Sequence, residues 1–160
     1  MAARSLPDLG PRGEGWFLIQ LVLFAAIAAA GALGPAWNGG ARVAGLAAGP
    51  ALLAAGGLLS LRGVLDLREN LTPFPKPLPA ARLVDTGSYG LVRHPIYGGL
   101  IVAATGWGFA TASLFALAGT VVLLGFFDLK SRREEAWLAD QFGGYAAYRR
   151  RTRKLLPWLY

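Results

Sequence analysis

Residues His94 to Phe127 read HPIYGGLIVAATGWGFATASLFALAGTVVLLGFF, a run of 34 residues without a charged side chain when the histidine is neutral. As one helix this run would be about 51 Å long, whereas the hydrocarbon core of a membrane is about 30 Å thick. Two full spans of about 20 residues each would need more residues than the run offers. The run therefore predicts a tight hairpin of two short helices, over about 95–109 and 112–129, that turns between Gly106 and Ser113.

Two further uncharged runs precede this one, over residues 15–41 and 43–61. Each contains enough apolar residues for a membrane-spanning helix, and we predict spans over about 16–34 and 42–62. The first run follows basic residues, as the apolar region of a secretory signal peptide does. Its apolar part is longer than the roughly 7–15 residues of such a signal, so we expect a retained helix.

Basic residues predict how these helices are oriented. Two of the 16 Lys and Arg residues precede the first run, five lie in residues 62–93 and eight lie in residues 130–160, which leaves only Arg42 elsewhere. Four spans place these three segments on one side, and basic residues favour the cytoplasmic side. With three spans, the basic C-terminal segment would lie outside.

The sequence thus predicts an all-α integral membrane protein with four transmembrane helices, the last two forming a tight hairpin. We expect one domain over residues 1–160, with a cytoplasmic loop over 62–94 and a cytoplasmic helical tail over 130–160. In this tail, residues 130–142 can continue the fourth helix, and Gly143-Gly144 breaks it. The expected location is a bacterial-type inner (cytoplasmic) membrane, with both termini and the active site cytoplasmic.

The composition agrees with a membrane protein. Hydrophobic residues make up 54% of the 160 residues and charged residues only 16%, whereas soluble domains carry about 25% charged residues. The absence of cysteine excludes a disulfide scaffold and a thiolate metal site. The net charge of +7 lies beside apolar runs, which fits an anionic membrane surface better than nucleic acid. The expected partners are therefore membrane lipids, with no nucleic acid.

Two segments carry side chains suited to chemistry. The single histidine, His94, precedes Pro95 in the segment Arg93–Gly99, where a helix start offers free N–H groups to a ligand. The acidic pair Glu134 and Glu135 follows two arginines. Adjacent residues point in different directions on a helix, so at most one of these carboxylates should face a given site. The pair is either solvated charge or a partner for a cationic ligand, and it lies on the same predicted side as His94.

The order and spacing of these segments resemble the isoprenylcysteine carboxyl methyltransferase and phospholipid methyltransferase superfamily of small membrane enzymes. The pattern covers about residues 71–157 and consists of Gly87-Ser88-Tyr89, Arg93-His94-Pro95-Ile96-Tyr97-Gly98, Glu134-Glu135, Leu138, Phe142-Gly143, Tyr145, Tyr148-Arg149 and Leu156-Pro157.

This resemblance implies methyl transfer from S-adenosylmethionine to a lipophilic acceptor in the membrane, such as a prenylcysteine-like carboxylate, a phospholipid amine or another isoprenoid or lipid. It also implies a cytoplasmic cofactor pocket formed by the loop and the last two helices. The cofactor-binding residues carried over by position are Leu83, Val84, Tyr89, His94, Pro95, Ile96, Tyr97 and Glu134. The remaining assignments are Lys130 and Arg149 for substrate binding, His94 and Glu135 for catalysis, and no metal ligand.

Two alternatives remain open at the level of the sequence. One is a membrane reductase of similar small helical design, although no glycine-rich dinucleotide fingerprint follows a predicted strand. The other is a non-catalytic membrane assembly or transport subunit, although the predicted spans contain few polar residues.

Overall fold

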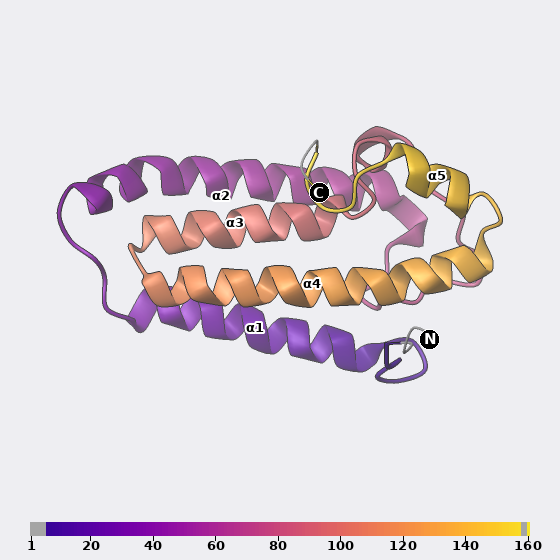
Figure 1. Ribbon diagram of the computed structural model, residues 1–160, viewed down its shortest axis with the longest axis horizontal. Helices are drawn as coiled ribbons and strands as arrows, with labels where there is room; N and C mark the ends of the chain where they lie inside the picture. Colours follow the sequence, from indigo (N-terminus) through magenta and orange to yellow (C-terminus); the bar gives the residue numbers. More distant parts are fainter. Residues whose placement is uncertain (1–5, 158–159) are drawn as a thin grey trace.

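The computed structural model describes residues 6–157 and 160, and within them it contains helices and no strand (Figure 1). Four long helices are α1 (Glu14–Leu33), α2 (Gly40–Leu67), α3 (Pro95–Ala110) and α4 (Leu114–Gln141). The short elements are the 3-10 turns η1 (Arg68–Asn70) and η2 (Gly87–Gly90) and the helix α5 (Tyr145–Arg151). The all-helical prediction is confirmed.

Three of the described helices, α1, α2 and α4, are long and apolar enough to cross a membrane. Helix α3 has 16 residues, a length of about 24 Å, and is shorter than a typical span. Many large apolar side chains lie exposed on the long helices, including Leu18, Val43 and Val121. Exposed apolar surface of this extent suits contact with lipid rather than water.

Two helix ends differ from the predicted segments. Helix α2 continues past residue 62 to Leu67, and its last turns carry an Arg62–Asp66 ion pair with 3.2 Å between Nε and Oδ1. At the other end of the chain, the predicted tail over 130–160 contains the end of α4, which stops at Gln141, and α5, which stops at Arg151. The predicted break at Gly143-Gly144 lies between these two helices. Thr152 is extended, and the next two residues, Arg153 and Lys154, accept backbone hydrogen bonds from the residues before α3.

Helices α2 and α3 pack with their backbones in contact. Glycines from both helices meet at this interface, and a methyl group added to Gly56 would overlap the carbonyl oxygen of Gly99 and the backbone nitrogen of Ala103. Gly49, seven residues before Gly56, and Gly106, seven residues after Gly99, meet in the same interface. Small residues allow such close approach, and in lipid this packing replaces the hydrophobic effect as the source of helix association.

Helices α1 and α4 pack through large side chains instead. Trp16 lies against Phe126 with 5.8 Å between ring centroids, and Phe24 lies against Phe127 at 6.3 Å. Figure 1 shows the resulting order α2, α3, α4, α1 across the molecule, with α3 and α4 joined by residues 111–113.

One end of the helices is closed by two non-helical segments. The proline-rich stretch 71–86 has no helix, as the prolines predict. The N-terminal residues 6–13 lie against it: the backbone nitrogen of Lys76 donates to the carbonyl oxygen of Arg12 at 3.3 Å, and the Arg12 guanidinium lies 4.3 Å from the centroid of the Phe74 ring. This end also carries α5 (Figure 1).

Candidate functional site

The segment that begins α3 is held by the C-terminal part of the chain. His94 is the residue before the helix, and Pro95 is its first residue. The backbone nitrogens of Arg93 and His94 donate to the carbonyl oxygens of Arg153 and Lys154 at 2.8 and 3.0 Å. The tail therefore fixes the position from which the His94 side chain projects.

Glu135 is the centre of a buried ionic cluster. Its Oε1 accepts from Arg93 Nε at 2.8 Å and lies 3.2 Å from His94 Nε2, while its Oε2 lies 3.6 Å from Arg149 Nε. The side chains of Arg93 and Glu135 are 9% and 6% exposed. Arg93 also donates to the carbonyl oxygen of Thr152. The cluster joins the start of α3, helix α4 and the tail.

Glu134 makes different contacts from its neighbour. Its Oε2 accepts a hydrogen bond from the Tyr97 hydroxyl at 2.7 Å and lies 3.8 Å from His94 Nδ1. The Tyr97 ring is stacked between His94 and Phe127, with centroid separations of 5.4 and 4.5 Å. Adjacent positions on α4 thus send one carboxylate toward Tyr97 and the other into the ionic cluster.

A cavity of about 360 Å³ lies beside these groups. Its walls come from all four long helices, the proline-rich stretch and α5. The residues assigned from the sequence that line it are Leu83, Val84, Tyr89, His94, Ile96, Tyr97, Lys130 and Glu134. Pro95, Glu135 and Arg149 do not line it, and the Arg149 side chain is 64% exposed on α5. Drug-sized ligands occupy cavities of about 300–1,000 Å³.

Lys130 lies at the part of the cavity next to α1. It is 1% exposed, its Nζ donates to Gln20 Oε1 at 2.6 Å, and Nζ lies 5.1 Å from the centroid of the Tyr97 ring. Gln20 was not singled out from the sequence. It is the one amide or charged side chain between Gly15 and Leu33, and a polar residue inside an apolar span is itself a signal of function.

Three tyrosines close the cavity on the side of the tail. The Tyr148 hydroxyl donates to the carbonyl oxygen of Tyr89 at 2.8 Å. The Tyr145 hydroxyl is buried and has no hydrogen-bond partner among the described residues. Burial raises the pKa of the Tyr145 phenol, and the Glu135 charge raises this pKa further. Burial also raises the pKa of Tyr89, so these phenols stay neutral and can donate hydrogen bonds to a ligand.

Within the described residues, no group of three or more His, Asp or Glu side chains is placed to hold a metal ion. The cavity combines aromatic rings and neutral hydroxyls with the Glu134 carboxylate and the basic side chains of Arg82, Arg93 and Lys130. Carboxylates bind cations by charge-assisted hydrogen bonds, and aromatic faces attract cations and stack on flat rings. The arrangement is suited to an organic ligand that carries an aromatic ring together with charged groups of both signs.

Fold and site together define a small helical protein with membrane-length helices and, at one end, a cavity that is lined by both apolar and polar side chains. The family model of the phospholipid methyltransferases matches residues 44–144, which is more than half of the chain. The chain belongs to the phospholipid methyltransferase family, in agreement with the resemblance seen in the sequence. The match begins inside α2 and ends just before α5, so α1 and residues 145–160 lie outside it.

One relative is the cobalt-zinc-cadmium resistance protein CzcN of Cupriavidus metallidurans. It is 38% identical over 80 residues, which cover 48% of this chain and 36% of that protein. The alignment thus spans about a third of the length of the relative. No solved structure matches the chain.

Proposed function

We propose that this protein transfers a methyl group from S-adenosylmethionine to a lipophilic acceptor that resides in the membrane, in the manner of the isoprenylcysteine carboxyl methyltransferases. Family membership supports the reaction class. The observation that carries the proposal is the cavity in which Glu134, Tyr97 and His94 face one space. The acceptor is a prenylcysteine-like carboxylate, a phospholipid amine or another lipid or isoprenoid.

The residues around the cavity fit this cofactor. Glu134 can pair with its ammonium group or accept from its ribose hydroxyls, and Tyr89 and Tyr97 offer aromatic faces. The buried Tyr145 hydroxyl, which has no partner among the described residues, can donate to it. When bound, S-adenosylmethionine supplies an electrophilic methyl group on a positively charged sulfur.

The chain contributes orientation and exclusion of water to the reaction. The proline-rich stretch lines one side of the cavity and is itself held by the N-terminal segment, which limits the access of water that would compete with the acceptor. His94 can take a proton from an amine acceptor, since it lines the cavity, and Glu135 orients its ring through Nε2. A carboxylate acceptor needs no base.

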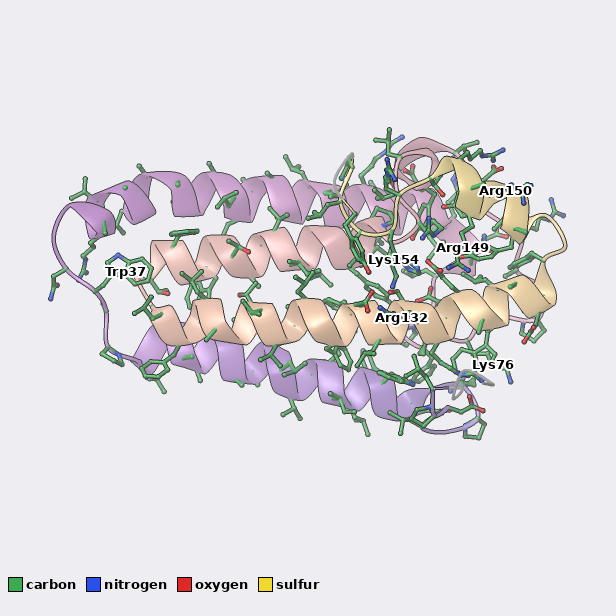
Figure 2. The ribbon with its side chains drawn as sticks, in the orientation of Figure 1. Trp37, Lys76, Arg132, Arg149, Arg150 and Lys154 are labelled. Atoms are coloured by element: carbon green, nitrogen blue, oxygen red, sulfur yellow. The ribbon has the colours of Figure 1, made fainter. Side chains whose placement is uncertain are left out.

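We further propose four membrane crossings, with α3 and α4 as the hairpin and with both termini and the cavity in the cytoplasm. Basic side chains support this orientation: Figure 2 shows Lys76, Arg132, Arg149, Arg150 and Lys154 toward the cavity end and Trp37 at the opposite end. Helix α4 has 28 residues and is long enough to continue past the membrane face, where it carries Glu134 and Glu135.

Cysteine labelling tests this topology, because the chain has no native cysteine. Asn38 and Ala80 are exposed and lie at opposite ends of α2. Asn38→Cys in intact cells should react with an impermeant maleimide, and Ala80→Cys should react only after the membrane is opened. The reverse pattern contradicts the proposed orientation.

Calorimetric titration of the purified protein tests the reaction class. S-adenosylhomocysteine and S-adenosylmethionine should bind, and NADPH, the probe for a reductase, should not. Glu134→Gln should weaken binding, whereas Asp140→Asn, an exposed carboxylate on the same helix, should leave it unchanged. Binding of NADPH without binding of S-adenosylhomocysteine favours a reductase, and binding of neither favours a non-catalytic subunit.

A further inference from the structure

One wall of the cavity is a loop whose two ends are tied together. This proline loop, residues 71–81, follows η1, and its residues 71–75, 77 and 81 line the cavity. At its base, the Asn70 side chain donates to the carbonyl oxygen of Arg82 at 3.2 Å and accepts from the backbone nitrogen of Arg82 at 3.1 Å. The prolines at positions 73, 75, 77 and 79 remove backbone donors and stiffen the chain. The loop is therefore a stiff flap with a fixed base.

The tip of the proline loop is held by the N-terminal segment. The backbone nitrogen of Lys76 donates to the carbonyl oxygen of Arg12 at 3.3 Å, and Lys76 Nζ donates to that of Pro11 at 3.2 Å. The Arg12 guanidinium lies 4.3 Å from the centroid of the Phe74 ring. Figure 2 shows Lys76 at the end of the molecule that carries the N-terminal segment. Water competes for exposed polar contacts of this kind, so each of them is weak.

The N-terminal segment has its own anchors on α1 and α4. Asp8 forms an ion pair with Arg133, whose guanidinium lies 4.1 Å from the centroid of the Trp137 ring. Trp16 Nε1 donates to the carbonyl oxygen of Pro7 at 3.1 Å. The Arg133 side chain is only 15% exposed, and Trp16 is buried. The segment can therefore stay in place on the two helices while the proline loop moves.

We propose that the proline loop opens toward the aqueous side by separating from Pro11 and Arg12, and that this latch sets how fast charged ligands enter and leave the cavity. A charged ligand needs an aqueous entrance, because its transfer through lipid is costly. The hydrogen bond from Gln141 Nε2 to the carbonyl oxygen of Leu78, at 2.9 Å, breaks in the same movement. The inference rests on the proposed function only for the identity of the ligand. Pro11 and Arg12 do not line the cavity, and both precede the family match.

A cross-link across the latch tests the movement, because the chain has no native cysteine. In Arg12→Cys/Lys76→Cys, a backbone hydrogen bond keeps the two positions adjacent, so a short bis-methanethiosulfonate can join the thiols. The protein in lipid nanodiscs is loaded with tritiated S-adenosylhomocysteine, cross-linked and chased with unlabelled ligand. Release should be at least about tenfold slower than in the parent, as expected where opening controls release. Reductant should restore it, and neither single-cysteine variant should slow after the same treatment.

Weakening the latch should have the opposite effect. Arg12→Ala and Lys76→Met each remove one latch contact, and neither side chain lines the cavity. Association and dissociation rates of S-adenosylhomocysteine should rise by a common factor of about threefold or more, the size expected for one exposed contact. The dissociation constant should change by less than about twofold, because a gate acts equally in both directions. Arg150→Ala, at an exposed arginine outside the cavity, should change neither rate.

Thiol labelling tests the latch without the cofactor. Leu100→Cys places a thiol in the cavity wall, where a permanently cationic methanethiosulfonate must arrive from the aqueous side. Addition of Arg12→Ala should speed this labelling, and addition of Arg150→Ala should not. A parent that does not bind S-adenosylhomocysteine refutes the proposed function, and the labelling rates then still test the flap.

Three results overturn the inference. The first is a cross-linked protein that releases S-adenosylhomocysteine at the rate of the parent. The second is unchanged exchange and labelling rates in both Arg12→Ala and Lys76→Met. The third is faster exchange in Asn70→Ala but not in the latch variants, which places the opening at the base of the loop, beside an outer groove of about 550 Å³.

Discussion

The two pairs of helices are built in opposite ways. Helices α2 and α3 meet through glycines, with no room for a side chain at Gly56 or Gly99. Helices α1 and α4 meet through aromatic rings and through the hydrogen bond between Gln20 and Lys130. Backbone contact allows little adjustment, whereas side chains can change rotamer without moving the helices. The first pair is suited to fix a position, and the second is suited to vary a binding surface.

This difference matches what each pair contributes to the cavity. Helix α3 presents His94 and Tyr97 from its first turn, and its position is set by α2 and by the tail. Helix α4, from the second pair, supplies the charged side chains of Lys130 and Glu134 to the cavity wall. The Glu135 cluster ties Arg93 and His94 at the start of α3 to α4, so it holds the two pairs in register.

The largest effect should come from breaking that link. Glu135→Ala leaves Arg93 buried without its carboxylate, and removing one partner of a buried pair costs about 3–5 kcal/mol. Thermal unfolding in detergent should show a large drop in stability, and the tail should become sensitive to protease. Arg132→Ala, which breaks an exposed pair with Asp128, is the control and should cost about 0–1 kcal/mol. Equal effects of the two variants would falsify the role of the cluster.

The next effect should come from the glycine interface. Gly56→Ala places a methyl group against the backbone of α3, and overpacking of this kind costs about 1–3 kcal/mol. Its neighbour Gly57 has no atom within 4 Å of an added methyl group. Gly57→Ala should therefore be neutral or stabilise by about 0.4–1 kcal/mol. Unfolding curves of the two variants provide the comparison, and similar curves would mean that the helices are not in backbone contact.

Much of this architecture could be predicted from the sequence, because the apolar runs indicate where the long helices lie, although α2 continues past its run to Leu67. The turn at residues 111–113 lies within the range that the run after His94 predicts. The end of the tail helix could not be predicted, because the backbone after Arg151 pairs with Arg93 and His94, and such long-range pairing leaves no local signal.

The candidate site, like the fold, could be predicted from the sequence only in part. Tyr97 and Glu134 belong to motifs with fixed spacing, and both line the cavity. The contact of Gln20 with Lys130 joins residues 110 positions apart, so it depends on how α1 packs against α4. The sequence marks Gln20 as a polar residue in an apolar span but does not indicate its partner. Likewise, the sequence does not indicate that Glu135 faces Arg93.

A smaller effect should come from Tyr97, which lies where the two pairs face each other. Tyr97→Phe removes the hydroxyl that donates to Glu134 and keeps the ring stacked on Phe127. Hydrogen bonds to charged groups contribute about 1.5–3 kcal/mol, so affinity for S-adenosylhomocysteine should fall roughly tenfold or more while the fold is retained. Calorimetry measures this affinity. An unchanged value would show that the Tyr97–Glu134 bond does not shape the cofactor site.

The smallest effect is expected at Arg149, which sharpens the contrast between buried and exposed partners of one carboxylate. Its Nε lies 3.6 Å from Glu135 Oε2, its side chain is 64% exposed, and it does not line the cavity. An ion pair of this kind contributes about 0–1 kcal/mol, and salt screens it. Arg149→Ala should therefore change the free energy of unfolding by less than about 1 kcal/mol, and S-adenosylhomocysteine affinity by less than about threefold.

Arg93→Ala, at the buried partner of the same carboxylate, is the matched comparison and should lower the free energy of unfolding several times more. A loss of methyl transfer in Arg149→Ala with stability and cofactor affinity intact would instead support the substrate role that the sequence resemblance assigns to this arginine, and would indicate that the acceptor contacts α5 before it reaches the cavity.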